Sequence, residues 1–444
     1  MFILDTLIAL LNTCIAYKDK EKGITIYCAL SFVMPVADIG DYRISYEIIA
    51  FVFLLPVIVY EFVKFRNWKI KTENILLLLW LFIFGAATFI TAIRYQTSIG
   101  WIQGFAMFRY VILYFWMTQT NALKKNWVYI MKFVTGINFG VCLLQALVPN
   151  IYKIFSFLYK HNGSSAYIVL ESMWEGNYNR LFGTFSTPAV TSYLFLITTI
   201  CFFIQYFYVN NTKENLIYLI LSVSGGLGTA TKAYNMGIIM ILLATVCLWI
   251  IFKLYHKIKN GKNLRFWKKK YRYTIPIICL GVILFATIFE VQGVRVTKYL
   301  KNINVIQALQ TRYMIGVEGD DGEDKHIAAT TEEMTAALEG KETIIGFGAT
   351  KPKGEKVQDG EWPMLFHDTG YLGLFLVFLL VGGLGIKNLI RMQIENLLYL
   401  LVIIALGLAI KSLLSLLGIL LLSYITVNDN EINEKRFIIE DKNV

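Results

Sequence analysis

Charged residues are scarce in this 444-residue chain, at 16% of the total, whereas hydrophobic residues make up 56%. A soluble core cannot absorb so much apolar surface, so the composition excludes a set of two or three water-soluble domains. Proline is also rare, with 7 residues, and the lack of polar low-complexity tracts excludes a largely disordered chain. The composition therefore predicts a polytopic membrane protein, whose apolar surface is covered by lipid.

The 6 cysteines lie within apolar stretches and none has CxxC spacing, which indicates neither a disulfide framework nor a metal site. The common motifs of soluble enzymes, namely GxGxxG, Walker A, HExxH, GxSxG and a DxD carboxylate cluster, do not occur in the sequence. We therefore expect no metal and no other cofactor. No cleavable signal peptide is expected either, because the apolar residues 2–16 lack a preceding basic region.

Apolar runs of about 15–24 residues recur along the chain and predict membrane-spanning helices. Twelve such runs are expected, and the N-terminal run 2–16 is either a thirteenth helix or a segment in the membrane interface. The fold class is therefore an all-α polytopic integral membrane protein. The predicted spans are 24–38, 45–63, 74–93, 99–118, 127–148, 186–208, 215–231, 233–252, 274–290, 367–386, 396–410 and 412–426.

Lysine and arginine are distributed unevenly between the predicted connections, and this asymmetry predicts the orientation. With Lys253–Tyr273 placed in the cytoplasm, the connections on that side hold 21 basic residues, against 7 in the short connections on the other side. The net charge of +11 therefore reflects membrane topology, and we expect no nucleic-acid partner. We expect a multi-pass protein of the cytoplasmic membrane, with Pro149–Ser186 and Gln292–Phe366 on the extracytoplasmic side.

These expectations divide the chain into five regions. The second outer segment, between the ninth and tenth spans, carries twelve acidic and nine basic residues and is too polar to be embedded in lipid. The regions are an N-terminal segment (1–23), a first membrane bundle (24–290) with an outer loop (149–185), a large extracytoplasmic loop (291–366), the last membrane helices (367–426) and a polar cytoplasmic tail (427–444).

Two basic residues lie at the predicted outer ends of spans, beside glycines. Arg180 opens the stretch RLFGTFSTP, where a guanidinium can bind a phosphate with two parallel hydrogen bonds or can simply anchor the chain at the interface. Lys232 lies in GTATKAY, where two apolar runs meet with almost no polar linker. A cation at such a junction needs a partner, which is either an anionic ligand or a carboxylate of the protein.

Three further features lie in the large outer loop and at its end. Arg312 stands in LQTRYM, and Gly346 and Gly348 belong to IIGFGA, where glycine allows close backbone approach to a ligand but also suits a plain turn. His367 and Asp368 open the tenth predicted span. A neutral imidazole can accept a proton from a hydroxyl group while the carboxylate orients it, and the alternative is a helix cap at Asp368 with an incidental histidine.

The order of these motifs resembles that of the O-antigen polymerase and O-antigen ligase superfamily, which includes Wzy-type polymerases and WaaL-type ligases. The resemblance covers roughly residues 24–426 and runs from R-x2-G-x-F-x2-P through T-x-T-K-A and the outer-loop arginine to GFGA and H-D-x-G-Y-L-G. The sequence departs from the family pattern at Lys232, where arginine is usual, and at Asp368, where asparagine is common. Lysine keeps the charge but loses the two-pronged geometry of arginine.

The resemblance implies a GT-C-like, metal-independent glycosyltransferase that polymerises polyprenyl-diphosphate-linked oligosaccharides, such as undecaprenyl diphosphate glycans, into capsular, O-antigen or wall polysaccharide. It implies that Arg180, Lys232 and Arg312 bind the diphosphate, that His367 and Arg312 are catalytic, and that Asp368, Gly346 and Gly348 support them. The implied partners are the lipid-linked donor, a glycan acceptor, membrane lipid, and flippase and chain-length regulator proteins.

Other functions stay open. A ligase uses the same donor with a different acceptor; lysine outnumbers arginine 31 to 11, which is typical of an AT-rich genome and favours a polymerase of capsule or wall polysaccharide. A flippase or other transporter is opposed by the lack of internal repeats and of ionisable residues in the middle of spans. If the protein has only a structural or assembly role, single changes at Arg180, Lys232, Arg312 or His367 should leave function intact.

Overall fold

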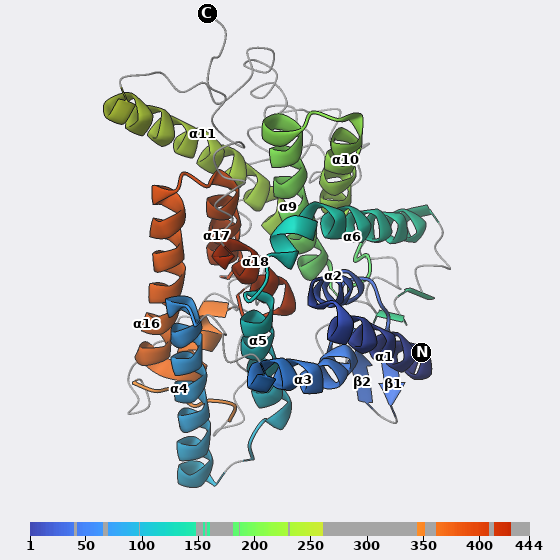
Figure 1. Cartoon of the computed structure of the whole chain (residues 1–444), viewed down its shortest axis with the longest axis vertical. Coiled ribbons are helices and arrows are strands. Elements are labelled where there is room, and N and C mark those ends of the chain that lie inside the picture. The colour runs from blue at the N-terminus through green and yellow to red at the C-terminus, as the bar shows by residue number, and fades with distance from the viewer. Residues whose placement is uncertain are drawn as a thin grey trace, which may run out of the picture.

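A computed structural model of the chain describes residues 1–39, 42–64, 70–96, 98–147, 154–155, 158–159, 181–185, 187–229, 231–260, 344–350, 361–407 and 413–427. Helices account for most of these residues, and one small β-hairpin interrupts them (Figure 1). The elements are α1 (Phe2–Lys18), α2 (Lys20–Leu30), β1 (Val36–Ile39), β2 (Tyr42–Ser45), α3 (Tyr46–Lys64), α4 (Thr72–Tyr95), α5 (Trp101–Met117), α6 (Ala122–Leu147), α9 (Pro188–Ile204), the π-helical turn η1 (Gln205–Val209), α10 (Lys213–Gly228), α11 (Lys232–Asn260), α16 (Glu361–Ile390), α17 (Ile394–Leu406) and α18 (Leu416–Thr426).

Five helical segments in the described part of the chain are long and apolar enough to cross a membrane. Four of them expose many large apolar side chains, as expected of surfaces that face lipid, whereas Pro188–Val209 is mostly buried inside the protein. The protein is thus mostly helical and carries the long apolar helices of a membrane protein, which agrees with the coarse fold prediction. The five segments are Tyr46–Lys64, Thr72–Tyr95, Ala122–Leu147, Pro188–Val209 and Met364–Ile390.

Most predicted spans coincide with helices. The apolar runs between residues 45 and 252 match α3, α4, α5, α6, α9 with η1, α10 and α11, and the last three runs match α16, α17 and α18. The N-terminal run is helical as well, because α1 extends from Phe2 to Lys18. The predicted span 274–290 lies outside the described residues. The structure describes only residues 154–155, 158–159 and 181–185 of the predicted outer loop 149–185, and only residue 427 of the predicted tail 427–444.

The predicted span 24–38 is wrong. Helix α2 ends at Leu30, and the chain turns before β1, which pairs with β2 in antiparallel register, Val36 opposite Ser45. The physical reason is Pro35, which has no N–H for a helical hydrogen bond and precedes the strand directly. Overall apolarity obscured this signal, because a hydropathy window does not distinguish a helix from a strand.

Helix α9 lies at the centre of the bundle. Figure 1 shows it among α6, α10, α11 and α17, and nearly all its residues are buried, including Thr191, Ser192 and Thr198. Because this helix is buried on every side, other helices cover it and lipid does not. Its start follows from the sequence, because the side chain of Thr187 caps the N–H of Val190 and Pro188 occupies the first turn.

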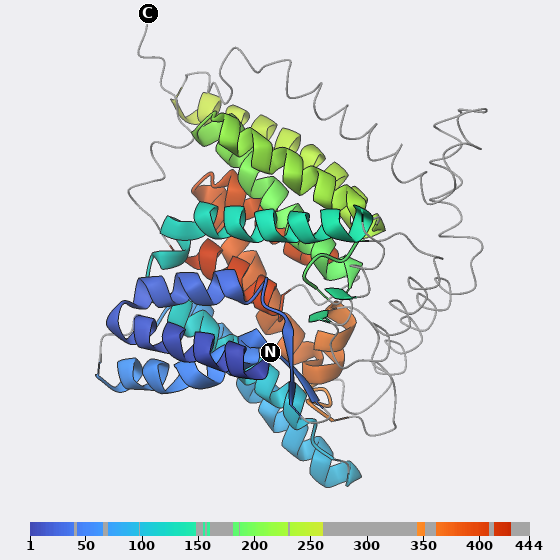
Figure 2. The same cartoon turned by 90° about the vertical axis from the view of Figure 1, so that its right-hand side faces the viewer.

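Charged residues near helix ends form ion pairs between helices. Lys20 pairs with Glu61 at 2.6 Å, Lys387 with Glu73 at 2.9 Å, and Lys125 with Glu21 at 3.4 Å. These ends are the connections that the basic-residue asymmetry assigns to a single side of the membrane. Figure 2 shows the blue helices α1–α3 and the teal helix α6 side by side, running across the view.

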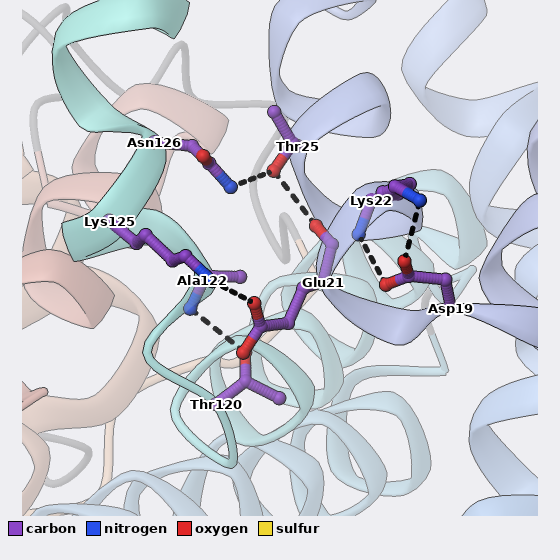
Figure 3. Close-up of polar contacts among 8 residues, drawn as sticks. All are labelled: Asp19, Glu21, Lys22, Thr25, Thr120, Ala122, Lys125 and Asn126. Atoms are coloured by element: carbon purple, nitrogen blue, oxygen red, sulfur yellow. Dashed lines mark hydrogen bonds and ion pairs between the residues drawn. The ribbon is translucent and has the colours of Figure 1, made fainter.

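The junction of α1 and α2 contains further polar contacts (Figure 3). Asp19 caps α2 by accepting the backbone N–H of Lys22, and this hydrogen bond holds the pKa of the exposed carboxyl below its usual range. Asn126 at the start of α6 donates to the hydroxyl of Thr25 at 2.9 Å. Polar contacts thus connect α2 to the start of α6.

Candidate functional site

The structure describes four of the seven predicted site residues in full. His367 and Asp368 belong to α16, and Gly346 and Gly348 lie in the short segment 344–350. Lys232 is the first residue of α11, and its side chain is not described. Arg180 and Arg312 lie outside the described residues.

Helix α16 is broken at Gly370, and the break positions His367 and Asp368. Gly370 has φ 59° and ψ −160°, a conformation that is essentially restricted to glycine. The residues before it form a short separate helical segment, and the indole of Trp362 anchors this segment by donating to the carbonyl of Ile404 in α17 at 3.0 Å. Asp368 therefore lies near the end of a helical segment, so the alternative prediction of an N-terminal cap at this residue is wrong.

The segment 344–350 packs directly against this break. The backbone N–H groups of Phe347 and Gly348 donate to the carbonyls of His367 and Asp368, each at 2.8 Å. Gly346 and Gly348 have φ of 72° and 65°, which favours glycine. A Cβ at position 346 would lie 2.6 Å from the carbonyl oxygen of His367. The glycines thus allow close approach to the backbone of α16, and two N–H groups of this segment bind the protein itself.

The same segment also contacts α4 and the start of α5. The backbone N–H of Ala349 donates to the hydroxyl of Thr88 at 2.8 Å, and the N–H of Gly100 donates to the carbonyl of Ala349 at 2.7 Å. A Cβ at position 348 would collide with the backbone of Thr88. Residues 344–350 therefore connect α4, α5 and α16, and they bring Gln103, in the first turn of α5, next to Asp368.

His367, Asp368 and Gln103 form a hydrogen-bonded series. Nδ1 of His367 lies 3.0 Å from Oδ1 of Asp368, and Nε2 of Gln103 donates to Oδ2 of the same carboxylate at 2.8 Å. The side chain of Asp368 is 4% exposed and that of His367 is 15% exposed. The ring of Phe347 lies 5.0 Å from the imidazole, centroid to centroid. Pairing of Nδ1 with the carboxylate leaves Nε2 of the histidine as the nitrogen that can exchange a proton with a ligand.

The predicted clusters around Arg180 and Lys232 also meet in space. The backbone N–H of Leu181 donates to the carbonyl of Gly228 at 3.1 Å. The side chain of Gln145 accepts the N–H groups of Phe182 and Gly183 at 3.1 and 3.2 Å, which holds the turn after Arg180. The structure thus joins the predicted clusters in pairs, the 181–188 turn with the 228–232 junction and segment 344–350 with 367–370. Both pairs lie toward the right-hand side of Figure 2.

The sequence analysis missed two features. Gln103 received no role, because one glutamine near a helix start is not distinctive. The second is the ion pair between Arg109 of α5 and Glu47 of α3 at 2.9 Å, in which the arginine side chain is 3% exposed. The sequence contained a signal for this ion pair, because a single arginine within the apolar run WIQGFAMFRYVILYFWM needs a partner inside the protein. The argument that ionisable residues are missing from the spans, which opposed a transporter, is therefore wrong.

Within the described ranges, no group of three or more His, Cys, Asp or Glu side chains is arranged to hold a metal ion. What the described site can do chemically is move a proton at Nε2 of His367, with the carboxylate of Asp368 stabilising the imidazolium that forms. No family model, curated protein or solved structure matches this chain. The functional argument therefore depends on the residues of the site and on the order of the motifs.

Proposed function

We propose that the protein is a membrane glycosyltransferase that polymerises polyprenyl-diphosphate-linked oligosaccharide repeats on the outer face of the cytoplasmic membrane. The observation that supports this most directly is the pairing of His367 with Asp368 at 3.0 Å, in the short helical segment before the break of α16 at Gly370. A histidine oriented by a carboxylate is a standard arrangement for removing a proton from a hydroxyl group.

The proposed reaction uses this group as follows. Nε2 of His367 takes the proton of the acceptor sugar hydroxyl as its oxygen attacks the anomeric carbon of the donor glycan. The bond between that carbon and the diphosphate oxygen breaks, and its electron pair leaves with the diphosphate. Attack opposite the leaving group inverts the configuration at the anomeric carbon. The carboxylate of Asp368 stabilises the positive charge that His367 acquires.

Negative charge develops on the departing diphosphate and requires nearby cations. Arg180, Lys232 and Arg312 are the proposed partners, since the order of motifs puts all three on the predicted outer side. Arginine can bind two phosphate oxygens at once, whereas lysine supplies a compact point charge. The backbone contact between Leu181 and Gly228, at 3.1 Å, supports joint action of the first two, because it joins the segments that follow Arg180 and precede Lys232.

The test is deletion of the gene followed by sizing of the glycans on a gel, with complementation by His367→Ala and His367→Gln. A polymerase predicts that the deletion strain accumulates single repeats and that neither variant restores long chains. General base catalysis is usually worth about 10²–10⁴-fold, so His367→Ala should lower turnover by that factor with donor binding retained. His367→Gln separates hydrogen bonding from proton transfer, because glutamine cannot act as a base.

Three outcomes contradict parts of this proposal. Long chains that remain on the polyprenyl carrier in the deletion strain identify a ligase. Unpolymerised repeats trapped on the cytoplasmic face identify a transporter. The buried pair of Arg109 and Glu47 is the observation that favours this alternative, because ionisable residues inside spans often mark a transport path. Normal polymer from His367→Gln at matched protein levels would reduce the role of the histidine to positioning.

A further inference from the structure

The side chain of Gln103 connects α5 to the carboxylate of Asp368 by a hydrogen bond between residues 265 positions apart in the sequence. Its Nε2 lies 2.8 Å from Oδ2, while Oδ1 of the same carboxylate faces Nδ1 of His367 at 3.0 Å. The two carboxylate oxygens therefore have different partners, one an amide and the other an imidazole.

We infer that Gln103 is a positioning residue that acts on His367 through Asp368. This inference rests on the proposed function of His367 as a general base. The carboxylate accepts hydrogen bonds on both oxygens, so its plane cannot rotate without losing one of them. Held in this way, Oδ1 accepts the Nδ1–H of the imidazole, which selects the tautomer that leaves Nε2 free to accept a proton.

An amide suits this position better than a carboxylate or an apolar side chain. The side chain of Asp368 is 4% exposed, so an oxygen without a donor would carry the full cost of desolvation. Glutamine supplies a neutral donor, which satisfies Oδ2 without adding a second charge beside the imidazole. A glutamate in the same place would bring two carboxylates within 2.8 Å, where only one of them stays ionised at neutral pH.

The backbone around Gln103 is held independently of its side chain. The N–H of Gly100 donates to the carbonyl of Ala349 at 2.7 Å, and the N–H of Ala349 donates to the hydroxyl of Thr88 at 2.8 Å. The first turn of α5 is thus attached to segment 344–350 and to α4. Gln103→Leu should therefore remove the amide donor and leave the path of the backbone unchanged.

The experiment compares Gln103→Leu, the isosteric Gln103→Glu and the control Gln119→Leu, a change just beyond the C-terminal end of α5. Turnover is measured on purified full-length protein with a lipid-linked donor. The tautomer of His367 is measured by ¹⁵N NMR in nanodiscs, with the resonance assigned by its loss in His367→Gln. We expect both Gln103 variants to lower turnover about 10–100-fold, as for other residues that orient a catalytic group, and to weaken the preference for the Nδ1–H tautomer. Gln119→Leu should change neither quantity.

The two proposals fail in different ways. An unchanged tautomer and normal turnover in both Gln103 variants, with His367→Ala inactive, would overturn the role of Gln103 and leave the proposed function standing. Full turnover in His367→Ala would overturn the proposed function, while the NMR measurement would still report whether Gln103 orients the imidazole. If Gln103→Leu does not fold, the unbranched Gln103→Met, which likewise has no hydrogen-bond donor, decides, since a normal tautomer and normal turnover in that variant contradict the inference.

Discussion

The guanidinium of Arg109 lies 2.9 Å from the carboxylate of Glu47 and joins the middle of α5 to the start of α3. The hydroxyl of Tyr27 donates to the backbone carbonyl of Glu47 at 3.3 Å, so α2 takes part in the same junction. Nε and Nη1 of the arginine have no hydrogen-bond partner among the described residues, which makes the remaining bond to Glu47 more important. An apolar run predicts a surface that faces lipid, but at Arg109 this part of α5 faces Glu47 of α3 inside the protein.

Removing one partner of this pair should destabilise the protein strongly. We expect Glu47→Gln to lower the free energy of unfolding by about 3–5 kcal/mol, because it leaves the buried charge of Arg109 uncompensated. Arg109→Met should lower the free energy of unfolding by a smaller amount, because the Glu47 side chain is 17% exposed and solvent still reaches its charge. The double variant Glu47→Gln, Arg109→Met should recover most of the loss. Unfolding in mixed micelles measures all four proteins.

The matched control is the exposed pair of Lys125 and Glu21, which is separated by 3.4 Å with side chains 70% and 42% exposed. Such pairs are worth about 0–1 kcal/mol, so Lys125→Ala should have little effect. Equal losses at the buried and the exposed pair would contradict the role assigned to Glu47.

A side chain at position 346 should disrupt the packing of segment 344–350 on α16. In Gly346→Ala the new Cβ would lie 2.5 Å from the backbone N of Thr369, and the residue would also keep an unfavourable φ of 72°. We expect a loss of about 1–3 kcal/mol from the strained backbone alone, and a loss of activity because the carbonyl of His367 must move. Thermal unfolding and turnover are the measurements.

Gly382→Ala on α16 is the control for this substitution. Nothing lies within 4 Å of a Cβ at this helical position, so alanine should be neutral or should stabilise the helix by up to about 1 kcal/mol. If Gly346→Ala behaves like Gly382→Ala, segment 344–350 does not depend on close backbone approach.

The proposed diphosphate site predicts different tolerance at two basic residues. Arg312→Ala should lower polymer formation at least about 10²-fold, the usual effect of losing a group that stabilises transition-state charge. Arg312→Lys should recover only part of it, because lysine lacks the two-pronged geometry. If the proposed function holds, Lys232→Arg should be tolerated, because arginine is usual at this position in the superfamily that the motifs resemble. Near-normal polymer from Arg312→Ala, at matched protein levels, would remove this residue from the site.

The orientation in the membrane can be tested by cysteine labelling in intact cells. In a variant without the native cysteines, an impermeant maleimide should modify Thr330→Cys and should not modify Lys262→Cys, because the basic connection is predicted to be cytoplasmic. Lys125→Cys should be protected as well, since Lys125 contacts Glu21 at the predicted cytoplasmic end. The reverse pattern would overturn the orientation and the proposed mechanism together.

Local signals in the sequence predicted most of the helices. Apolar runs of sufficient length located α3, α4 and α6, and the capping residues Thr187 and Ser415 mark the starts of α9 and α18. The hairpin of β1 and β2 was not predicted, because the start of β1 was read as the end of an apolar run, although Pro35 precedes this strand and the two strands contain the charged residues Asp38 and Arg43.

Of the seven predicted site residues, the structure places four side by side, and the sequence did not predict how these four contact one another. Gly346, Gly348, His367 and Asp368 were predicted as one site from the order of motifs, and their adjacency agrees with that expectation. The sequence did not show whether Gly346 and Gly348 contact a ligand or the backbone of α16, because a glycine pair suits both contacts equally well.

The sequence by itself determined that this is a mostly helical protein with long apolar helices, because hydropathy and capping are local properties of a chain. Only the tertiary structure decided that Gln103 reaches Asp368 and that Arg109 reaches Glu47, 265 and 62 positions away. Helical periodicity states which face of a helix is apolar but not which helix covers it. Partners on different helices are set by the packing of the whole bundle.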